Sequence, residues 1–246
     1  MLRRGDWMKA RRILPWAAAW LTRIAGCYDG GMDITWLGHA CFRLRGRDIT
    51  LITDPFGRSL GLSLGRQTAE VVTVSHDSPN HSAVEAISGQ PRVVRGPGEY
   101  EIGGAMIAGV ATAGERSGKD QHGRNTAYAI EIDDLTVCHL GDLGKTLTPE
   151  QIEALKDPDM LLVPVGGLCT IAPGEVAEVV SQLEPKLVVP MHYALPGISL
   201  KLEPIDRFCR EMGVTDTHTQ PKLTVTRSSL PDETTVVILE ATAARK

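Results

Sequence analysis

Residues 71–82 read VVTVSHDSPNHS, and this stretch decides both the fold and the candidate site. Its first four residues are valines and a threonine, which favour an extended strand. The strand pattern ends in a polar turn that carries two histidines, His76 and His81. Imidazoles at the end of a strand can project into a cleft while the sheet holds them in place, as many metal sites require. The stretch therefore predicts a buried strand that delivers metal ligands.

The composition of the whole chain is that of a globular protein. Its 246 residues are 42% hydrophobic and 23% charged, which suits one or two domains with a sizeable core. The formal net charge of −4 gives no overall basic surface, so nucleic acid is not an expected partner. No apolar run reaches the roughly eighteen residues of a membrane span, so a membrane is not an expected partner either.

The cysteines indicate a reducing, cytoplasmic location. They are widely spaced, form no CxxC pair and mostly lie in apolar runs, so we expect reduced core residues rather than disulfides or structural zinc. They are Cys27, Cys41, Cys138, Cys169 and Cys209.

The first 31 residues differ from the rest of the chain. They carry six basic residues and a short apolar run over residues 13–21, and residues 24–27 resemble a lipoprotein cleavage site. Arg23 lies between that run and that site, where an export signal would be uninterrupted. We therefore expect residues 1–31 to be a poorly ordered N-terminal extension and residues 32–246 to form the folded domain. An export signal is the alternative.

Strands dominate the first half of the folded domain, and helices alternate with buried strands in the second half. Thr148, Pro149 and Gln151 predict a helix start, because they supply a cap, a proline in the first turn and the partner of a capping box. Gly213 predicts the end of a later helix. Many strands with a few late helices predict an α+β fold, in which two sheets pack face to face with helices outside.

Histidines, together with one aspartate, follow several separate strand patterns. The residues at these strand ends are His39, His76, His81, His139, Asp142 and His192. We expect them to converge on one rim, where the set indicates a metal site. For His39, a capping or core role is an equal alternative to substrate contact. Asp54, in LITDP, is interpreted as a turn residue before proline.

Six short motifs in register resemble one known family. They are GHA at 38–40, TDP at 53–55, the histidine turn at 76–81, HLGD at 139–142, PVGG at 164–167 and PMHY at 190–193. In this order they resemble the metallo-β-lactamase superfamily, in its branch of small metal-dependent hydrolases. The resemblance implies an αββα four-layer sandwich with the site on the rim between the two sheets.

The turn departs from the metal motif of that family, H-x-H-x-D-H. Here the middle histidine is replaced by Ser78 and the aspartate by Asn80. The resemblance implies that one ion is bound by His76, the missing histidine and His139. It implies that the other ion is bound by the missing aspartate, His81 and His192, with Asp142 between the two ions. Each ion position has therefore lost one ligand.

The remaining ligands predict one bound ion rather than two. Two dications would face a single carboxylate, that of Asp142, and the neutral oxygens of Ser78 and Asn80 do not replace the lost ligands for zinc. Each ion position still keeps three protein ligands when Asp142 is included, and three ligands plus water is the usual catalytic zinc site. We expect one Zn ion, with Mn or Fe as alternatives and a vacant site as the competing hypothesis.

With a metal, the resemblance implies a hydrolase in which a metal-bound hydroxide attacks an ester, lactone or phosphoester bond of a small soluble substrate. Asp142 would bind the metal, Asn80 would orient the attacking water without accepting its proton, and His39 would contact substrate or carry a proton. The alternative is a catalytically weak or inactive binding or scaffold protein of the same fold. A nuclease is not favoured, because the chain is acidic and lacks an added nucleic-acid domain.

Overall fold

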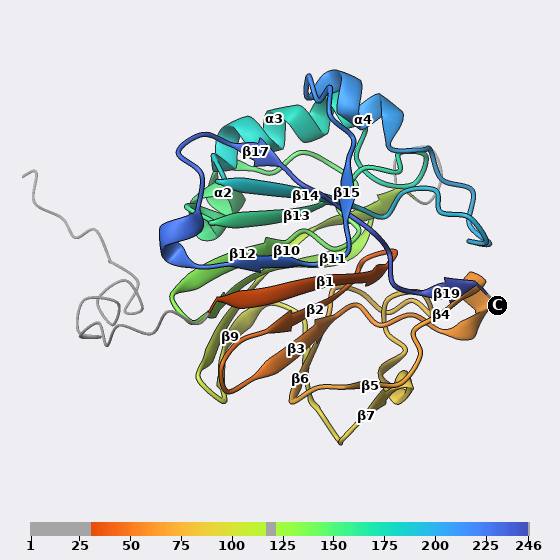
Figure 1. The fold of residues 1–246 in the computed structure, drawn as a ribbon, viewed down its shortest axis with the longest axis vertical. Coiled ribbons are helices and arrows are strands. Elements are labelled where there is room, and N and C mark those ends of the chain that lie inside the picture. Colours follow the sequence, from red (N-terminus) through yellow and green to blue (C-terminus); the bar gives the residue numbers. More distant parts are fainter. Residues whose placement is uncertain (1–30, 117–121, 246) are drawn as a thin grey trace, which may run out of the picture.

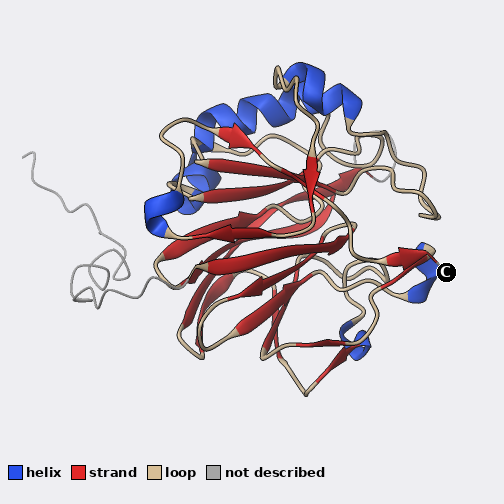
Figure 2. Ribbon diagram, viewed as in Figure 1, coloured by secondary structure: helices blue, strands red, loops and turns tan. Residues whose placement is uncertain are grey.

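The computed structural model describes residues 31–116 and 122–245. Apart from Gly31, the predicted N-terminal extension lies outside the described residues. The described chain forms two β-sheets packed face to face, with α-helices along the outer face of one of them (Figure 1, Figure 2). This confirms the predicted α+β sandwich. Within the described ranges, no helix is long and apolar enough to cross a membrane.

The first sheet has six strands and includes the strand that leads into the histidine turn at residues 76–81. In spatial order its strands are β16 (Leu223–Val225), β1 (Met32–Gly38), β2 (Cys41–Arg45), β3 (Thr50–Thr53), β6 (Val71–Val74) and β8 (Arg92–Arg95). The pairs β1–β2 and β2–β3 are antiparallel, whereas β3, β6 and β8 run parallel. The carboxyl ends of β3 and β6 therefore meet at one edge of the sheet.

The second sheet has seven strands and changes from antiparallel to parallel at its centre. In spatial order its strands are β17 (Thr235–Val236), β14 (Leu187–Met191), β13 (Met160–Pro164), β12 (Leu135–His139), β11 (His122–Ile132), β10 (Ala105–Arg116) and β9 (Gly98–Ile102). Strands β12, β13 and β14 are parallel, so their carboxyl ends also lie along one edge.

Short two-stranded pairs complete the β-structure of the described chain. They are β4 (Leu62–Ser63) with β19 (Ala244–Arg245), β5 (Gln67–Thr68) with β7 (Ile87–Ser88), and β15 (Thr219–Gln220) with β18 (Ile238–Leu239).

The helices cover the second sheet as the sequence predicts. They are α2 (Pro149–Leu155), α3 (Pro173–Leu183) and α4 (Asp206–Glu211), and Figure 1 shows them along the outer face that β12, β13 and β14 present. Thr148 and Gln151 form the predicted capping box at the start of α2. Gly213 follows the end of α4 with a left-handed φ of 66°, which glycine adopts without strain.

The outer layer over the first sheet is thinner and consists mostly of connecting chain. Strand β6 alternates between two cores: Val71 packs between the sheets, whereas Val72 and Val74 pack outward against a second apolar cluster. That cluster includes Phe56, Leu60, Leu62, Leu64 and Ile87 from the connections flanking the strands. The helical structure there is limited, among the described residues, to the 3-10 turns η2 (Arg58–Leu60) and η3 (Val84–Ala86).

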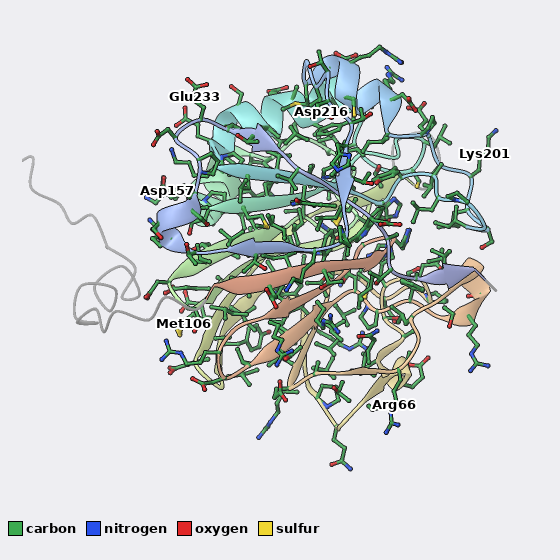
Figure 3. The ribbon with its side chains drawn as sticks, in the orientation of Figure 1. Arg66, Met106, Asp157, Lys201, Asp216 and Glu233 are labelled. Carbon is green, nitrogen blue, oxygen red and sulfur yellow. The ribbon has the colours of Figure 1, made fainter. Side chains whose placement is uncertain are left out.

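Charged side chains lie on the periphery and leave the space between the sheets apolar. Figure 3 shows Arg66, Asp157 and Lys201 projecting outward from loops and strand edges. Among the polar links between the sheets, the buried Tyr128 hydroxyl on β11 donates a hydrogen bond of 2.9 Å to the Val74 carbonyl at the end of β6. This link holds the two sheets together next to the edge where the strand ends converge.

Candidate metal centre

The carboxyl ends of strands from both sheets bring their polar residues to one rim. His39 follows β1, His76 and His81 follow β6, Asp142 follows β12, and His192 follows β14. Among the described residues, the groups whose possible ligand atoms lie within 4.8 Å of one another overlap in these positions. They are His39, His81 and His192; His76, His81 and Asp142; and Asp142, Cys169 and His192.

Asp142 connects the groups that the two sheets contribute. Its Oδ2 lies 3.8 Å from Nε2 of His76, and its Oδ1 lies 3.4 Å from Nε2 of His192. Two ligands of one tetrahedral zinc ion are about 3.4 Å apart, as bond lengths of about 2.1 Å require. Oδ1 of Asp142 is buried and has no hydrogen-bond partner, and the same is true of Nδ1 of His192. These separations and the orphaned oxygen fit a divalent ion at this rim.

Asp54 fixes the ring of His81 from behind. Its Oδ2 lies 2.8 Å from Nδ1 of His81, and the same carboxylate accepts hydrogen bonds from the backbone N–H and the hydroxyl of Ser75. Burial raises the pKa of Asp54, but these hydrogen bonds and the nearby histidines outweigh it, so the pKa lies below its ordinary value. The ionised Asp54 therefore holds the proton of His81 on Nδ1 and directs Nε2 toward the rim.

His39 contacts the nitrogen of His81 that faces the rim. The two Nε2 atoms are 3.1 Å apart, and because His81 has its proton on Nδ1, the donor in this bond is His39. An ion bound by Nε2 of His81 would take the place of this hydrogen bond. The backbone carbonyl of His39 in turn accepts hydrogen bonds from Trp36 Nε1 and from the amide of His192. The His39 side chain has no exposed surface, so the expected direct contact with substrate does not fit its burial, and its observed action is on His81.

His139 has a different environment from the other histidines. Its Nε2 donates a hydrogen bond of 2.8 Å to the Ala40 carbonyl, and its Nδ1 accepts from the amide of Gly141 at 3.3 Å. Both ring nitrogens therefore bind backbone groups, and the ligand groups of the described chain do not include this residue. In this arrangement His139 joins the two sheets rather than offering a lone pair to the rim.

The positions that depart from the family motif still shape the turn. The Ser78 carbonyl accepts hydrogen bonds from the amides of His81 and Ser82, and its hydroxyl accepts a long one of 3.5 Å from the amide of Asn80. Asn80 is half-buried. Asp77 is exposed, and its carboxylate accepts from the Ser82 hydroxyl, so it does not replace a lost ligand. The turn keeps its backbone while two of its ligand side chains are missing.

A buried asparagine positions the turn that carries Asp142. Oδ1 of Asn125 accepts the amide hydrogen of Asp142 at 3.0 Å, and its Nδ2 donates to the Leu140 carbonyl and the Thr112 hydroxyl. A Cβ at Gly141 would lie 2.4 Å from Oδ1 of Asn125, and the φ of Gly141 is +60°. Only glycine allows this approach, which explains the glycine in HLGD.

Burial keeps most of the site histidines uncharged. It is the largest cause that lowers the pKa of each of these four: His39, His76, His139 and His192. For His192 it outweighs the opposing effect of Asp142 and brings the pKa to about 4. For His39 the charges that His192 and His81 would carry add to burial, and the pKa lies well below 6.5. Neutral imidazoles are the form that binds metals, so this donor set suits a metal ion at neutral pH.

Comparison with known proteins places the chain in a family. Residues 33–192 match the Beta-lactamase superfamily domain, which covers well over half of the chain. The chain belongs to this superfamily. It is 31% identical over 202 residues to a UPF0173 metal-dependent hydrolase of Methanoculleus marisnigri, covering 72% of this chain and 88% of the relative. It is 28% identical over 215 residues to another from Methanopyrus kandleri, covering 74% of this chain and 94% of the relative.

Solved structures agree with this membership in the superfamily. A Thermotoga maritima protein, assigned to the Zn-dependent hydrolases of the metallo-β-lactamase superfamily, is 38% identical and superposes with a TM-score of 0.69 over 85% of this chain and 98% of its own. A Parabacteroides distasonis structure has a TM-score of 0.58 at 18% identity, over 85% and 94% of the two chains, which supports the fold alone. The relatives thus support a metal-dependent hydrolase of the β-lactamase superfamily.

Three residues that build the site, Asp54, Asn125 and Cys169, are not assigned to it by the sequence patterns. Asp54 is more than a turn residue, and the sequence contains a signal for this: Asp54 follows β3 and Ser75 follows β6, and these two strands are parallel neighbours. Cys169 is half-buried, unlike the core residues Cys41, Cys138 and Cys209, which corrects the prediction that it belongs to the core. Cys27 lies outside the described residues.

Proposed function

We propose that this member of the β-lactamase superfamily hydrolyses an ester, lactone or phosphoester bond of a small soluble substrate at a metal site on the rim. The observation that carries the proposal is the cluster of His76, His81, Asp142 and His192, with a buried carboxylate oxygen of Asp142 that has no hydrogen-bond partner. Leaving such an oxygen unsatisfied costs about 1–3 kcal/mol, which a bound cation would offset.

The protein residues that would hold the ion are neutral imidazoles and one carboxylate. His76 lies near Oδ2 of Asp142 and His192 near Oδ1, and His81 belongs to the same ligand group as His76 and Asp142. This mixed nitrogen and oxygen set suits Zn²⁺, with Mn²⁺ or Fe²⁺ as the alternatives. When bound, the ion would lower the pKa of a water molecule toward neutrality and stabilise negative charge that develops on the substrate.

The surrounding residues would position these ligands rather than react themselves. Asp54 keeps His81 in the tautomer whose Nε2 faces the rim, and Asn125 holds the turn of Asp142. His76 is the most open of the ligands, with 16% of its side chain exposed against 2% for His192. Substrate would therefore approach from the side of His76.

Two features of the turn would limit the rate. In place of a carboxylate, Asn80 offers an amide that can hydrogen-bond a water molecule but cannot take up its proton. Ser78 provides no imidazole, so the positive charge at the rim would be held by fewer ligands. We therefore expect one ion per chain and slower hydrolysis than relatives with the complete motif support.

The location proposed for this activity is the cytoplasm. The cysteines within the described ranges form no disulfide, which is consistent with a reducing compartment.

The decisive experiment measures metal content and hydrolysis in the same preparation. Protein purified without chelator would be offered zinc, manganese or iron and assayed by elemental analysis, then with p-nitrophenyl esters, aliphatic lactones and bis(p-nitrophenyl) phosphate. Asp142→Ala should lose both metal and turnover. Asp77→Ala is the matched control, because this exposed carboxylate lies on the same turn but outside the ligand groups of the described chain.

The outcomes separate the proposal from its alternative. About one ion per chain with turnover that Asp142→Ala abolishes supports the hydrolase. Less than a few tenths of an ion per chain with every metal offered contradicts it. That result, together with a folded protein, favours the alternative of a binding or scaffold protein, which the loss of ligands at Ser78 and Asn80 motivates.

A further inference from the structure

The loop after β13 brings a sulfur atom to the rim. Sγ of Cys169 forms one ligand group with a carboxylate oxygen of Asp142 and a ring nitrogen of His192, and these three atoms lie within 4.8 Å of one another. The three residues follow β12, β13 and β14, which are adjacent parallel strands. A thiolate, a carboxylate and an imidazole are all ordinary ligands of zinc.

The loop is shaped so that Cys169 reaches this position. A Cβ at Gly166 would lie 2.1 Å from the carbonyl oxygen of His192, so glycine is needed for the close approach of the two loops. The next two residues, Gly167 and Leu168, both have a left-handed φ of 54°. The turn is closed by a hydrogen bond of 2.6 Å from the amide of Cys169 to the Gly167 carbonyl.

Leu168 shows that this conformation has a cost. A left-handed backbone is unfavourable by about 1–2 kcal/mol for a residue with a Cβ. Its side chain is also 57% exposed, so apolar burial does not offset that cost. Strain of this kind is often found at functional sites.

An independent observation points to a ligand between these residues. Oδ1 of Asp142 is buried without a hydrogen-bond partner, and it lies 3.4 Å from Nε2 of His192 without forming a hydrogen bond to it. Both side chains are nearly inaccessible, at 4% and 2% exposure. A cation that bound both atoms would satisfy the carboxylate and keep the observed separation.

Charge balance favours sulfur as the added ligand. The turn has lost an aspartate at the position of Asn80, so Asp142 is the carboxylate left in the ligand groups of the described residues. A cysteine that binds a metal does so as the thiolate and releases its proton to solvent, which adds one negative charge at the rim. Sulfur also selects soft or borderline ions such as Zn²⁺ over Mn²⁺ and Mg²⁺.

We propose that Cys169 is a metal ligand, which with Asp142 and His192 forms a sulfur-containing site for zinc on the ends of β12, β13 and β14. This inference rests on the proposed metal dependence but not on hydrolysis. With Cys169, the second sheet would supply three protein ligands to this ion.

Cobalt is the probe that tests this assignment, because a thiolate bound to Co²⁺ gives a charge-transfer band in the near ultraviolet. The full chain would be stripped with chelator, titrated with Co²⁺ and then with competing Zn²⁺. Cys169→Ala and the matched control Cys209→Ala would be treated identically, and circular dichroism would confirm that both are folded. Cys209 lies on α4 and is buried away from the ligand groups of the described chain.

We expect a charge-transfer band in the wild type that Zn²⁺ abolishes. Cys209→Ala should retain this band and Cys169→Ala should lack it. Zinc affinity should be at least tenfold weaker in Cys169→Ala than in the wild type. Cobalt binding without the band in the wild type, or an undiminished band in Cys169→Ala, would overturn the assignment. The hydrolysis assays test the proposed function independently of this assignment. A charge-transfer band in a protein without turnover contradicts the proposed hydrolysis but supports Cys169 as a ligand.

Discussion

The two sheets contribute to the rim in different ways. The first sheet contributes a turn, residues 76–81, in which two of the ligand positions of the family motif carry Ser78 and Asn80. The second sheet contributes Asp142, Cys169 and His192 from the ends of three adjacent parallel strands. His192 directly follows β14, and the amide of Asp142 is held by the buried Asn125. The backbone of the turn at 76–81, in contrast, is held by hydrogen bonds to the Ser78 carbonyl. A turn that has lost ligands therefore need not remove a metal site whose other residues are held by buried contacts.

The largest effect is expected when Asp142 is replaced, because it belongs to ligand groups with residues from both sheets. Asp142→Asn should lower zinc affinity by more than the roughly 100-fold that the loss of a ligand's outer hydrogen-bond partner can cost, because Asp142 belongs to both groups. Isothermal titration calorimetry would measure the change against Asp77→Asn. An affinity within threefold of the wild type would show that the two halves do not share this carboxylate.

The next largest effect is expected when the hydrogen bond between Asp54 and His81 is disturbed. Asp54→Asn should weaken zinc binding by roughly 10–100-fold, because the amide cannot both fix the tautomer of His81 and accept from Ser75. Asp159→Asn is the matched control, since Asp159 is also buried but bonds Arg227 at the far end of β13. If both variants are destabilised and neither loses zinc affinity, Asp54 supports the fold and not the ligand.

Acidification should lower the free energy of unfolding of the metal-free protein, because residues contributed to the rim by both sheets become protonated. The pKa of His192 is about 4 in the folded chain against 6.5 as its ordinary value, so the unfolded chain binds the extra proton between these values. The free energy of unfolding should therefore fall as the pH drops through this window, by about 1.4 kcal/mol per pH unit for each histidine that stays neutral. Below this window, protonation of Asp54 should remove further stability, because its pKa lies below 3.8.

Urea unfolding at a series of pH values would measure this dependence. His192→Asn should reduce the slope between pH 6.5 and about 4 relative to the wild type. A free energy of unfolding that stays constant across this window would contradict the burial of neutral histidines.

The smallest effect is expected when the two missing ligands of the turn at residues 76–81 are restored. Ser78→His with Asn80→Asp should raise metal content from about one ion per chain toward two, roughly a twofold change, and increase phosphodiesterase activity. The backbone of the turn is held by the Ser78 carbonyl, which the substitution keeps. Elemental analysis would measure the content, and Ser78→Gln with Asn80→Gln would serve as a control of similar bulk. An unchanged metal content would mean that the turn does not have the geometry of the motif.

The sequence predicts the strands, and the rim at which they end, better than the roles of single side chains. Polar residues at strand ends predict a common rim because parallel neighbours end at the same edge, and His76, His81, Asp142 and His192 meet there. His139 has the same sequence signature, but its ring turns to the Ala40 carbonyl, because a ring at the end of a strand has more than one rotamer. Sequence spacing does not distinguish these orientations.

Cys169 could not be assigned from the sequence, and the role of Asp54 follows from it only when the order of the strands is known, for a related reason. The position of Cys169 depends on the left-handed backbone of Gly167 and Leu168, and a left-handed leucine is rare enough that no pattern predicts it. The role of Asp54 depends on which strand neighbours β3, and the chain reaches that neighbour, β6, only after a connection with two short strands. Both residues are fixed by tertiary contacts.

The parallel arrangement of β12, β13 and β14 has a further consequence for how the rim opens. These strands lie at the centre of the second sheet, and nearly all their side chains are buried. Amide hydrogens in such a core exchange with solvent mainly when the whole domain unfolds, whereas a surface turn exchanges through small local openings. The strand ends from which the second sheet's half of the rim extends would thus lose their positions only when the domain unfolds, while the turn at 76–81 could open and close on its own timescale.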